Sequence, residues 1–159
     1  MKKIIILIYK FVLFISLFEY FFITKSSNAF FPKVNEPSKE ELKSTSIQIG
    51  KRAIQLMQFG LNDEAIKLLE LAVKLNPNET DIWISLAEAQ IRSNKKNQAL
   101  YSLNKAIKLE PNRQDIYFTT ASIYMDLQEP YQAKIAINKG LSINKNNEKG
   151  YFQLGNSEI

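Results

Sequence analysis

The sequence predicts an all-α protein built as a stacked array of helical hairpins. From about residue 39 onward, apolar residues recur at helix spacing, in runs separated by short polar breaks. Pro77 and Pro111 lie 34 residues apart. Two sets of alanines share this interval, Ala53, Ala87 and Ala121 in one set and Ala65, Ala99 and Ala133 in the other. A fixed period of this length indicates repeated two-helix units, each packed on the next.

Composition argues against an enzyme. The chain of 159 residues contains no cysteine and no histidine. It therefore has no disulfide, no thiolate nucleophile and no Cys-based metal centre, and it lacks the usual near-neutral general base. Adjacent carboxylates such as Asp63 and Glu64 do not converge on a helix. We predict a protein without catalytic activity, cofactor, metal site or small-molecule substrate.

The net charge of +5 gives little support for nucleic-acid binding. Residues 1–25 contribute +3 of this charge, which leaves +2 for residues 26–159. The lysines of the repeats alternate with Asn and Gln, whereas a nucleic-acid surface shows a denser basic patch. We therefore expect the partner to be a protein.

Residues 1–29 form a hydrophobic leader. Two lysines precede an apolar run from Ile4 to Ile23, which is interrupted by one lysine and one glutamate. The uninterrupted piece from Phe11 to Phe18 fits the core of a signal peptide, and Ser27-Asn28-Ala29 offers an acceptable cleavage site. The same run could remain as an uncleaved anchor helix, or lie as a peripheral segment in the cytoplasm. With a signal or an anchor, the basic end stays cytoplasmic and the repeats are exported.

Residues 30–38 read as an extended linker, because they contain two prolines and no helical period. The domain of residues 39–159 follows. Ser38 and Glu41 match a capping box at the start of a helix over about residues 39–59. Gly60 suits the left-handed conformation that commonly follows a helix.

The repeats cover residues 46–79, 80–113 and 114–147, with a partial fourth helix in residues 148–159. A large residue occurs early in each first helix, and a second small residue occurs late in each second helix. These positions are Ile49, Trp83 and Tyr117, and Ala72, Ala106 and Gly140. The pattern resembles the tetratricopeptide repeat, which implies a right-handed superhelix of antiparallel hairpins. Asn78 and Asn112 are predicted N-caps, and Gln90 stands where the family usually has an aromatic residue.

The resemblance implies a concave groove, lined by the first helix of each repeat, that binds other proteins. The groove residues predicted from this register are Met57, Ile84, Glu88, Ile91, Arg92, Phe118, Ser122, Met125, Asp126 and Phe152. Equivalent residues of stacked repeats lie side by side. We therefore expect one apolar row of Ile84, Phe118 and Phe152, and a second of Met57, Ile91 and Met125. The groove would take an apolar or amphipathic segment of a partner, or be covered by Phe30–Pro37 or the leader of the same chain.

The leader, the linker and the start of the first helix resemble tetratricopeptide proteins of cyanobacteria and plastids. Some of those proteins assist the assembly of photosynthetic complexes. The resemblance implies a scaffold or assembly factor whose partner is a subunit of a membrane complex. The expected location is the thylakoid lumen or periplasm, free or anchored with the repeats on the non-cytoplasmic side. The alternative is a periplasmic interaction module of secretion or cell-envelope machinery in another bacterium.

Overall fold

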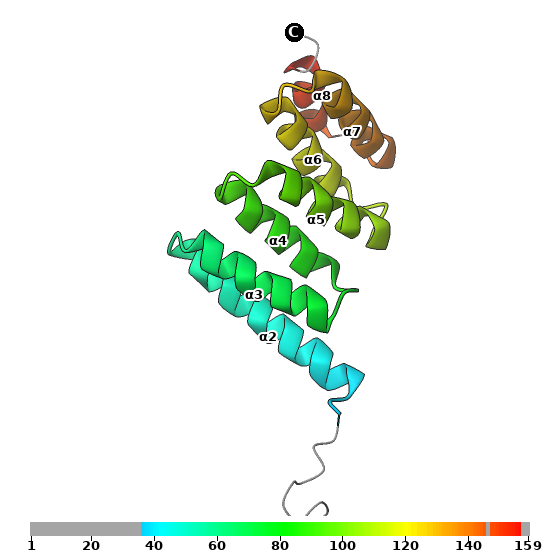
Figure 1. Cartoon of the computed structure of the whole chain (residues 1–159). Helices are drawn as coiled ribbons and strands as arrows, with labels where there is room; N and C mark the ends of the chain where they lie inside the picture. Colours follow the sequence, from blue (N-terminus) through cyan, green and yellow to red (C-terminus); the bar gives the residue numbers. More distant parts are fainter. Residues whose placement is uncertain (1–35, 146, 157–159) are drawn as a thin grey trace, which may run out of the picture. The chain divides into compact units, whose positions relative to one another are not determined.

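A computed structural model describes residues 36–145 and 147–156 (Figure 1). From Ser38 onward these residues form one compact unit of seven helices without a strand. The helices are α2 (Lys39–Gln58), α3 (Asn62–Leu75), α4 (Thr80–Arg92), α5 (Lys96–Leu109), α6 (Gln114–Asp126), α7 (Pro130–Ile143) and α8 (Glu148–Asn156). The predicted leader and residues 30–35 of the linker lie outside the described residues. None of the described helices is long and apolar enough to cross a membrane.

The helices pair as antiparallel hairpins, and each hairpin stacks on the next in chain order (Figure 1). The pairs are α2 with α3, α4 with α5, and α6 with α7, while α8 packs on α7. Helices α4 and α6 begin at Thr80 and Gln114, the first residues of the predicted second and third repeats. The all-α prediction is confirmed, and so is the 34-residue register.

The start of α2 has the predicted capping box. The Ser38 amide donates to Glu41 Oε2 at 2.7 Å, and the Glu41 amide donates to Ser38 Oγ at 3.2 Å. The hydrogen bond from the Ser38 backbone lowers the pKa of the Glu41 carboxyl below its ordinary value. Both orphan amides at this helix end are thereby satisfied.

The predicted N-caps Asn78 and Asn112 are wrong by one residue. Glu79 and Arg113 are the N-cap residues of α4 and α6, and neither side chain caps its helix. The proline and the asparagine after it form the turn, so the asparagine comes too early to reach the first helical amides. Each of these turns is held by a hydrogen bond from a large side chain of the following helix. Trp83 Nε1 donates to the Pro77 carbonyl, and the Tyr117 hydroxyl donates to the equivalent Pro111 carbonyl, each at 2.8 Å.

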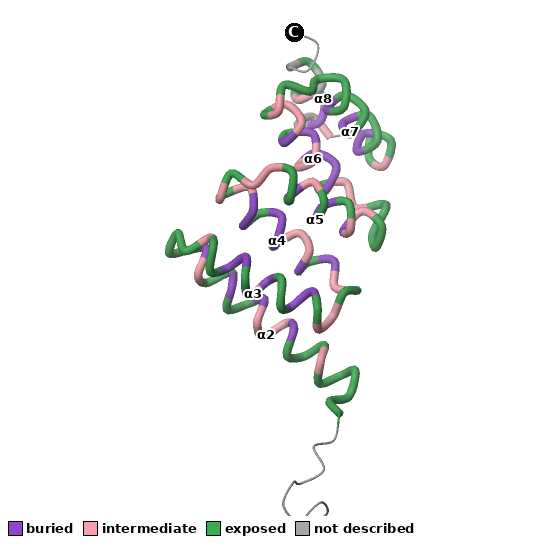
Figure 2. The backbone as a smooth tube through the Cα atoms, in the orientation of Figure 1, coloured by how far each residue is buried: buried purple, intermediate pink, exposed green. Residues whose placement is uncertain are grey.

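The small residues lie where the helices cross. All the alanines of the three predicted sets are at most 1% exposed, and Gly140 is buried (Figure 2). Side chains of this size let the backbones approach closely, so that larger neighbours fill the space beside them. The buried residues are Ala53, Ala87, Ala121, Ala65, Ala99, Ala133, Ala72, Ala106 and Gly140.

Gln90 departs from the family pattern together with Ser102, the residue that it contacts across the hairpin. The side chain is 4% exposed, and its Oε1 accepts a hydrogen bond of 2.8 Å from the fully buried hydroxyl of Ser102. Leu56 and Leu68 occupy the equivalent positions of the first repeat, so a polar pair replaces an apolar one. The hydrogen bond offsets the desolvation that either group alone would suffer.

Where the first helices of successive repeats touch, a glycine on one helix faces a large side chain on the other. Gly50 faces Ile82, whereas at the equivalent contact 68 residues later Phe118 faces Gly150. A Cβ atom on Gly150 would lie 2.6 Å from Phe118 Cζ, and one on Gly140 would lie 2.9 Å from Phe118 Cε1. The large ring therefore fits only because both neighbouring helices carry glycine, and it docks α8 on the third hairpin.

Each turn between the two helices of a hairpin contains one left-handed residue. These residues are Gly60 (φ 77°), Asn94 (φ 57°) and Gln128 (φ 60°), again at 34-residue intervals. Glycine and asparagine adopt this conformation readily, whereas glutamine does so at a steric cost. The three turns thus have the same geometry but unequal strain.

Substitutions at these turns should change stability in opposite directions. Gln128→Gly should raise the free energy of unfolding by about 0.5–1 kcal/mol, and Gly60→Ala should lower it by about 1 kcal/mol. No atom lies within 4 Å of a Cβ built on Gly60, so the effect is conformational. Both changes in the free energy of unfolding can be measured by urea denaturation, with circular dichroism as the signal. Gly155→Ala, a glycine within α8 with equal space around it, is the control and should not lower stability; a parallel loss there would contradict the explanation.

Gly150→Ala should release α8. The added methyl group would press on Phe118 and Leu141, and such overpacking costs about 1–3 kcal/mol. Amide hydrogen exchange over residues 148–156 should therefore accelerate. If α8 tolerated the methyl group, alanine would slow exchange through its better helix propensity of about 1 kcal/mol. The double variant Gly150→Ala with Phe118→Ile should restore part of the protection, because the smaller side chain removes the clash with Phe118 and leaves the one with Leu141.

Candidate functional site

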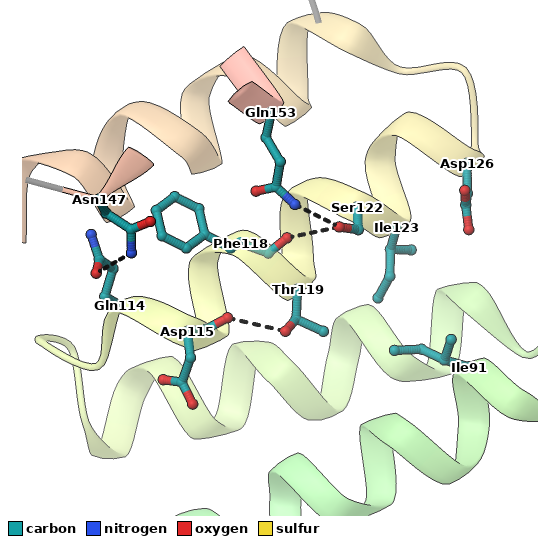
Figure 3. Close-up of a pocket in the computed structure, with 10 residues that line it drawn as sticks. All are labelled: Ile91, Gln114, Asp115, Phe118, Thr119, Ser122, Ile123, Asp126, Asn147 and Gln153. Atoms are coloured by element: carbon teal, nitrogen blue, oxygen red, sulfur yellow. Dashed lines mark hydrogen bonds between the residues drawn. The ribbon is translucent and has the colours of Figure 1, made fainter. Parts of the chain in front are cut away.

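Helices α4, α6 and α8 enclose a cleft of about 380 Å³ (Figure 3). Most of its wall comes from one face of α6, while α4 and α8 supply the two sides. The lining residues are Ile91, Gln114, Asp115, Phe118, Thr119, Ser122, Ile123, Asp126, Asn147 and Gln153. The lining thus combines three apolar side chains with seven polar or acidic ones.

A second hollow of about 350 Å³ adjoins the cleft. Ser122, Asp126 and Gln153 line both, so the two form a continuous surface over α6 and α8. Met125 and Phe152 add apolar surface to the second hollow, and Phe152 is 71% exposed. A side chain this apolar and this exposed is available to a partner.

The hydroxyl and amide donors of the cleft are directed at the protein itself. Thr119 Oγ1 donates to the Asp115 carbonyl at 3.0 Å, and Ser122 Oγ donates to the Phe118 carbonyl at 3.1 Å (Figure 3). Gln114 Nε2 donates to two carbonyls of α7 and its C-cap, Gly140 at 2.8 Å and Asn144 at 2.9 Å. These bonds hold α6 and α7 together and leave few donors facing the cleft.

The side chains from the C-terminal segment continue this pattern. Asn147 Nδ2 donates to Gln114 Oε1 at 2.9 Å, and Gln153 Nε2 donates to Ser122 Oγ at 3.1 Å (Figure 3). Because the Ser122 hydroxyl already donates to a carbonyl, it must accept from Gln153, which fixes the orientation of that amide. Gln153 Oε1 is buried and accepts no hydrogen bond from any described residue. An unpaired buried acceptor is unfavourable and needs a donor.

Ion pairs surround the cleft. Arg113 links successive repeats, with Nη1 at 2.6 Å from Asp81 Oδ1 and Nε at 3.2 Å from Asp115 Oδ1. The hydrogen bond to Asp81 raises the pKa of the Arg113 guanidinium above its ordinary value. At the other end, Lys96 Nζ lies 3.6 Å from Asp126 Oδ2. The side chains of Asp115 and Asp126 remain about 60% exposed and can accept further hydrogen bonds.

The structure brings six of the ten predicted groove residues to the two hollows. They are Ile91, Phe118, Ser122, Met125, Asp126 and Phe152. Glu88 and Arg92 form an exposed ion pair beside the cleft, and Arg92 also donates to the Met57 carbonyl at 3.4 Å. Ile84 is half-buried against the second core cluster.

The two expected apolar rows are not uniformly exposed. Met57 is 5% and Phe118 is 8% exposed, so both belong mainly to the core. Met57 packs in the first core cluster, while the Phe118 ring is held between α7 and α8. In the predicted row of Ile84, Phe118 and Phe152, Phe118 lines the cleft but is largely buried, because the glycines opposite it let the ring sink between the helices.

Sequence reasoning missed five residues that line the cleft, Gln114, Thr119, Ile123, Asn147 and Gln153. The available signal for Gln114 was the recurrence of a polar residue at its position, Ser46, Thr80 and Gln114. In the structure Ser46 donates to the Ala72 carbonyl at 3.0 Å, as Gln114 does to the equivalent Gly140 carbonyl. The place of Gln153 depends on how α8 docks, which the partial fourth repeat does not reveal. Among the described residues, no group of His, Cys, Asp and Glu side chains could hold a metal ion.

Comparison with known proteins places the repeats in a family. Two sequence models, both described as tetratricopeptide repeat, match residues 50–89 and residues 80–113 and 114–147. Together they span residues 50–147, more than half of the chain. The comparison with curated proteins found no match.

Solved structures share the fold. The first repeat domain of Spaghetti (RPAP3), bound to the HSP90 peptide SRMEEVD, is 20% identical with a TM-score of 0.68, covering 73% of this chain and 92% of that one. MamA is 23% identical, with a TM-score of 0.68 and coverage of 75% and 74%. The Yersinia enterocolitica type III secretion chaperone SycD, in complex with a peptide of the translocator YopD, is 14% identical, with a TM-score of 0.68, covering 72% of this chain and 93% of that one.

These identities are too low to transfer a ligand, but the matched sequence models, the 34-residue register and the hairpin stack agree. The chain belongs to the tetratricopeptide repeat family of protein–protein interaction modules.

Proposed function

We propose that the protein binds an apolar or amphipathic segment of another protein in the cleft of α4, α6 and α8. The observation that carries this proposal is the continuous surface formed by the two hollows, where the exposed side chain of Phe152 lines one hollow and the half-buried side chain of Ile91 lines the other. Exposed aromatic side chains beside preformed hollows are typical anchors of protein interfaces.

The size of the hollows favours a segment over a globular domain. Volumes of about 350 and 380 Å³ suit a few side chains that project from one helix or one extended strand. Two of the solved structures with this fold hold peptides, the HSP90 peptide in RPAP3 and the YopD peptide in SycD. Their likeness supports peptide binding here by analogy of fold.

We further propose that the partner is a subunit of a membrane complex whose assembly the protein assists. The hydrophobic run in residues 1–29 supports this setting. The competing proposal is an interaction module of the periplasm or cell envelope. Fractionation of cells that make the protein separates the two: co-purification with photosynthetic membranes supports assembly, whereas recovery with envelope material supports the alternative.

A photo-crosslinking residue at Phe152 should join the partner segment. We expect adducts that map by mass spectrometry to one contiguous apolar stretch of another protein. The matched control places the same residue at Tyr131, an aromatic side chain that is 74% exposed on α7 and lines neither hollow. Phe152→Ser should weaken partner binding about tenfold, as truncation of an interface anchor does, while Tyr131→Ser should not.

Equal crosslinks from both positions would contradict a role for the cleft. Adducts from Phe152 to residues 30–37 of the same chain would instead show that the protein covers its own cleft. Thermal unfolding followed by circular dichroism confirms that each variant is folded, which is expected because both aromatic side chains are exposed.

A further inference from the structure

We propose that the segment bound in this cleft is cationic, with Lys or Arg side chains placed around its apolar anchors. This inference rests on the proposed function and names the chemistry of its partner. It depends on which hydrogen-bonding groups the cleft leaves free.

The cleft offers acceptors and few donors. The hydroxyls of Thr119 and Ser122 and both amide hydrogens of Gln114 are directed at backbone carbonyls. The carboxylates of Asp115 and Asp126 are about 60% exposed and still have accepting positions. A partner that brings N–H donors can form hydrogen bonds with these groups. A partner that brings carboxylates cannot, because its own groups are acceptors too.

The charges of the lining point the same way. Among the described lining residues, Asp115 and Asp126 are the charged side chains, and both are acidic. Arg113 and Lys96 pair with them from outside the lining. Each carboxylate is exposed and accepts in more than one direction, so a second cation can approach from the cleft side.

The acidity of this face contrasts with the rest of the protein. Helices α4 and α6 carry the carboxylates Asp81, Glu88, Asp115 and Asp126 against Arg92 alone. Helices α5 and α7, the second helices of the same hairpins, carry five lysines and no acidic residue. The whole chain has a charge of +5, so non-specific attraction would favour an acidic peptide. A preference for a basic peptide is therefore diagnostic of the cleft.

The two carboxylates also set a spacing. Asp115 and Asp126 are 11 residues apart at the two ends of α6, about 16 Å along a helix at 1.5 Å per residue. An extended segment covers this span in about five residues at roughly 3.3 Å each. A segment with two basic residues about five positions apart and apolar residues between them fits the cleft.

The test uses the full-length chain in a neutral detergent and three fluorescein-labelled peptides. The peptides share leucine anchors and carry lysine, glutamine or glutamate at two positions five residues apart. Fluorescence anisotropy should show the lysine peptide binding about tenfold tighter than the glutamate peptide, as expected for two exposed ion pairs gained instead of repelled. Salt should weaken its binding more than that of the glutamine peptide.

Variants locate the effect. Asp115→Asn with Asp126→Asn should bring the lysine and glutamate peptides close to equal affinity. The matched control is Asp63→Asn, which also breaks an exposed lysine pair (2.7 Å to Lys95) but lies outside the cleft; it should leave the preference unchanged. Phe152→Ser should weaken the binding of all three peptides.

The outcomes separate this inference from the proposed function. Equal affinities for the three peptides, still reduced by Phe152→Ser, would overturn the cationic preference and leave segment binding in place. Preference for the glutamate peptide would overturn it directly. A failure of every peptide to bind in a Phe152-dependent way would overturn both.

Discussion

Close approach of the helices at buried small residues is the constraint on which this structure depends. Buried alanines at three positions of the repeat, replaced once by Gly140, let each helix approach its neighbours closely. The crossing positions recur every 34 residues, and so do the turn residues and the large side chains that cover the turns. One steric rule, applied three times, sets the hairpins, their stacking and the face that α4, α6 and α8 present.

That repetition explains why much of the fold could be predicted from the sequence. The size of a residue at a helix crossing depends on near neighbours, so the alanine pattern identified buried positions correctly. The same holds for the capping box of Ser38 and for the left-handed turn at Gly60, both of which are local. The predicted N-caps Asn78 and Asn112 were wrong by one residue, because a two-residue turn and a side-chain cap use the same residue types.

The cleft was harder to predict, because exposure depends on what lies across the next helix. Phe118 and Phe152 occupy equivalent positions, yet one is 8% and the other 71% exposed. The difference comes from Gly150 and Gly140, which admit the Phe118 ring. The position of a residue in the repeat predicts which face of its helix it occupies. The size of the residue across from it on the next helix decides whether it reaches solvent. The place of Gln153 depends on its hydrogen bond to Ser122, between α8 and α6, which the periodicity of the sequence does not show.

The unequal turns give the array an order of opening. In stacked repeats the free energy is close to a sum of each unit and its interface with the next, so the unit with the weakest internal and interface contributions opens first. The first hairpin turns on Gly60 and begins with a capping box, whereas the third turns on Gln128 and is followed by a helix of nine residues. We expect local unfolding to start at α8 and α7. Since α6 and α8 supply most of the cleft, a bound segment would stabilise the least stable part of the array, and binding and local folding there are thermodynamically linked.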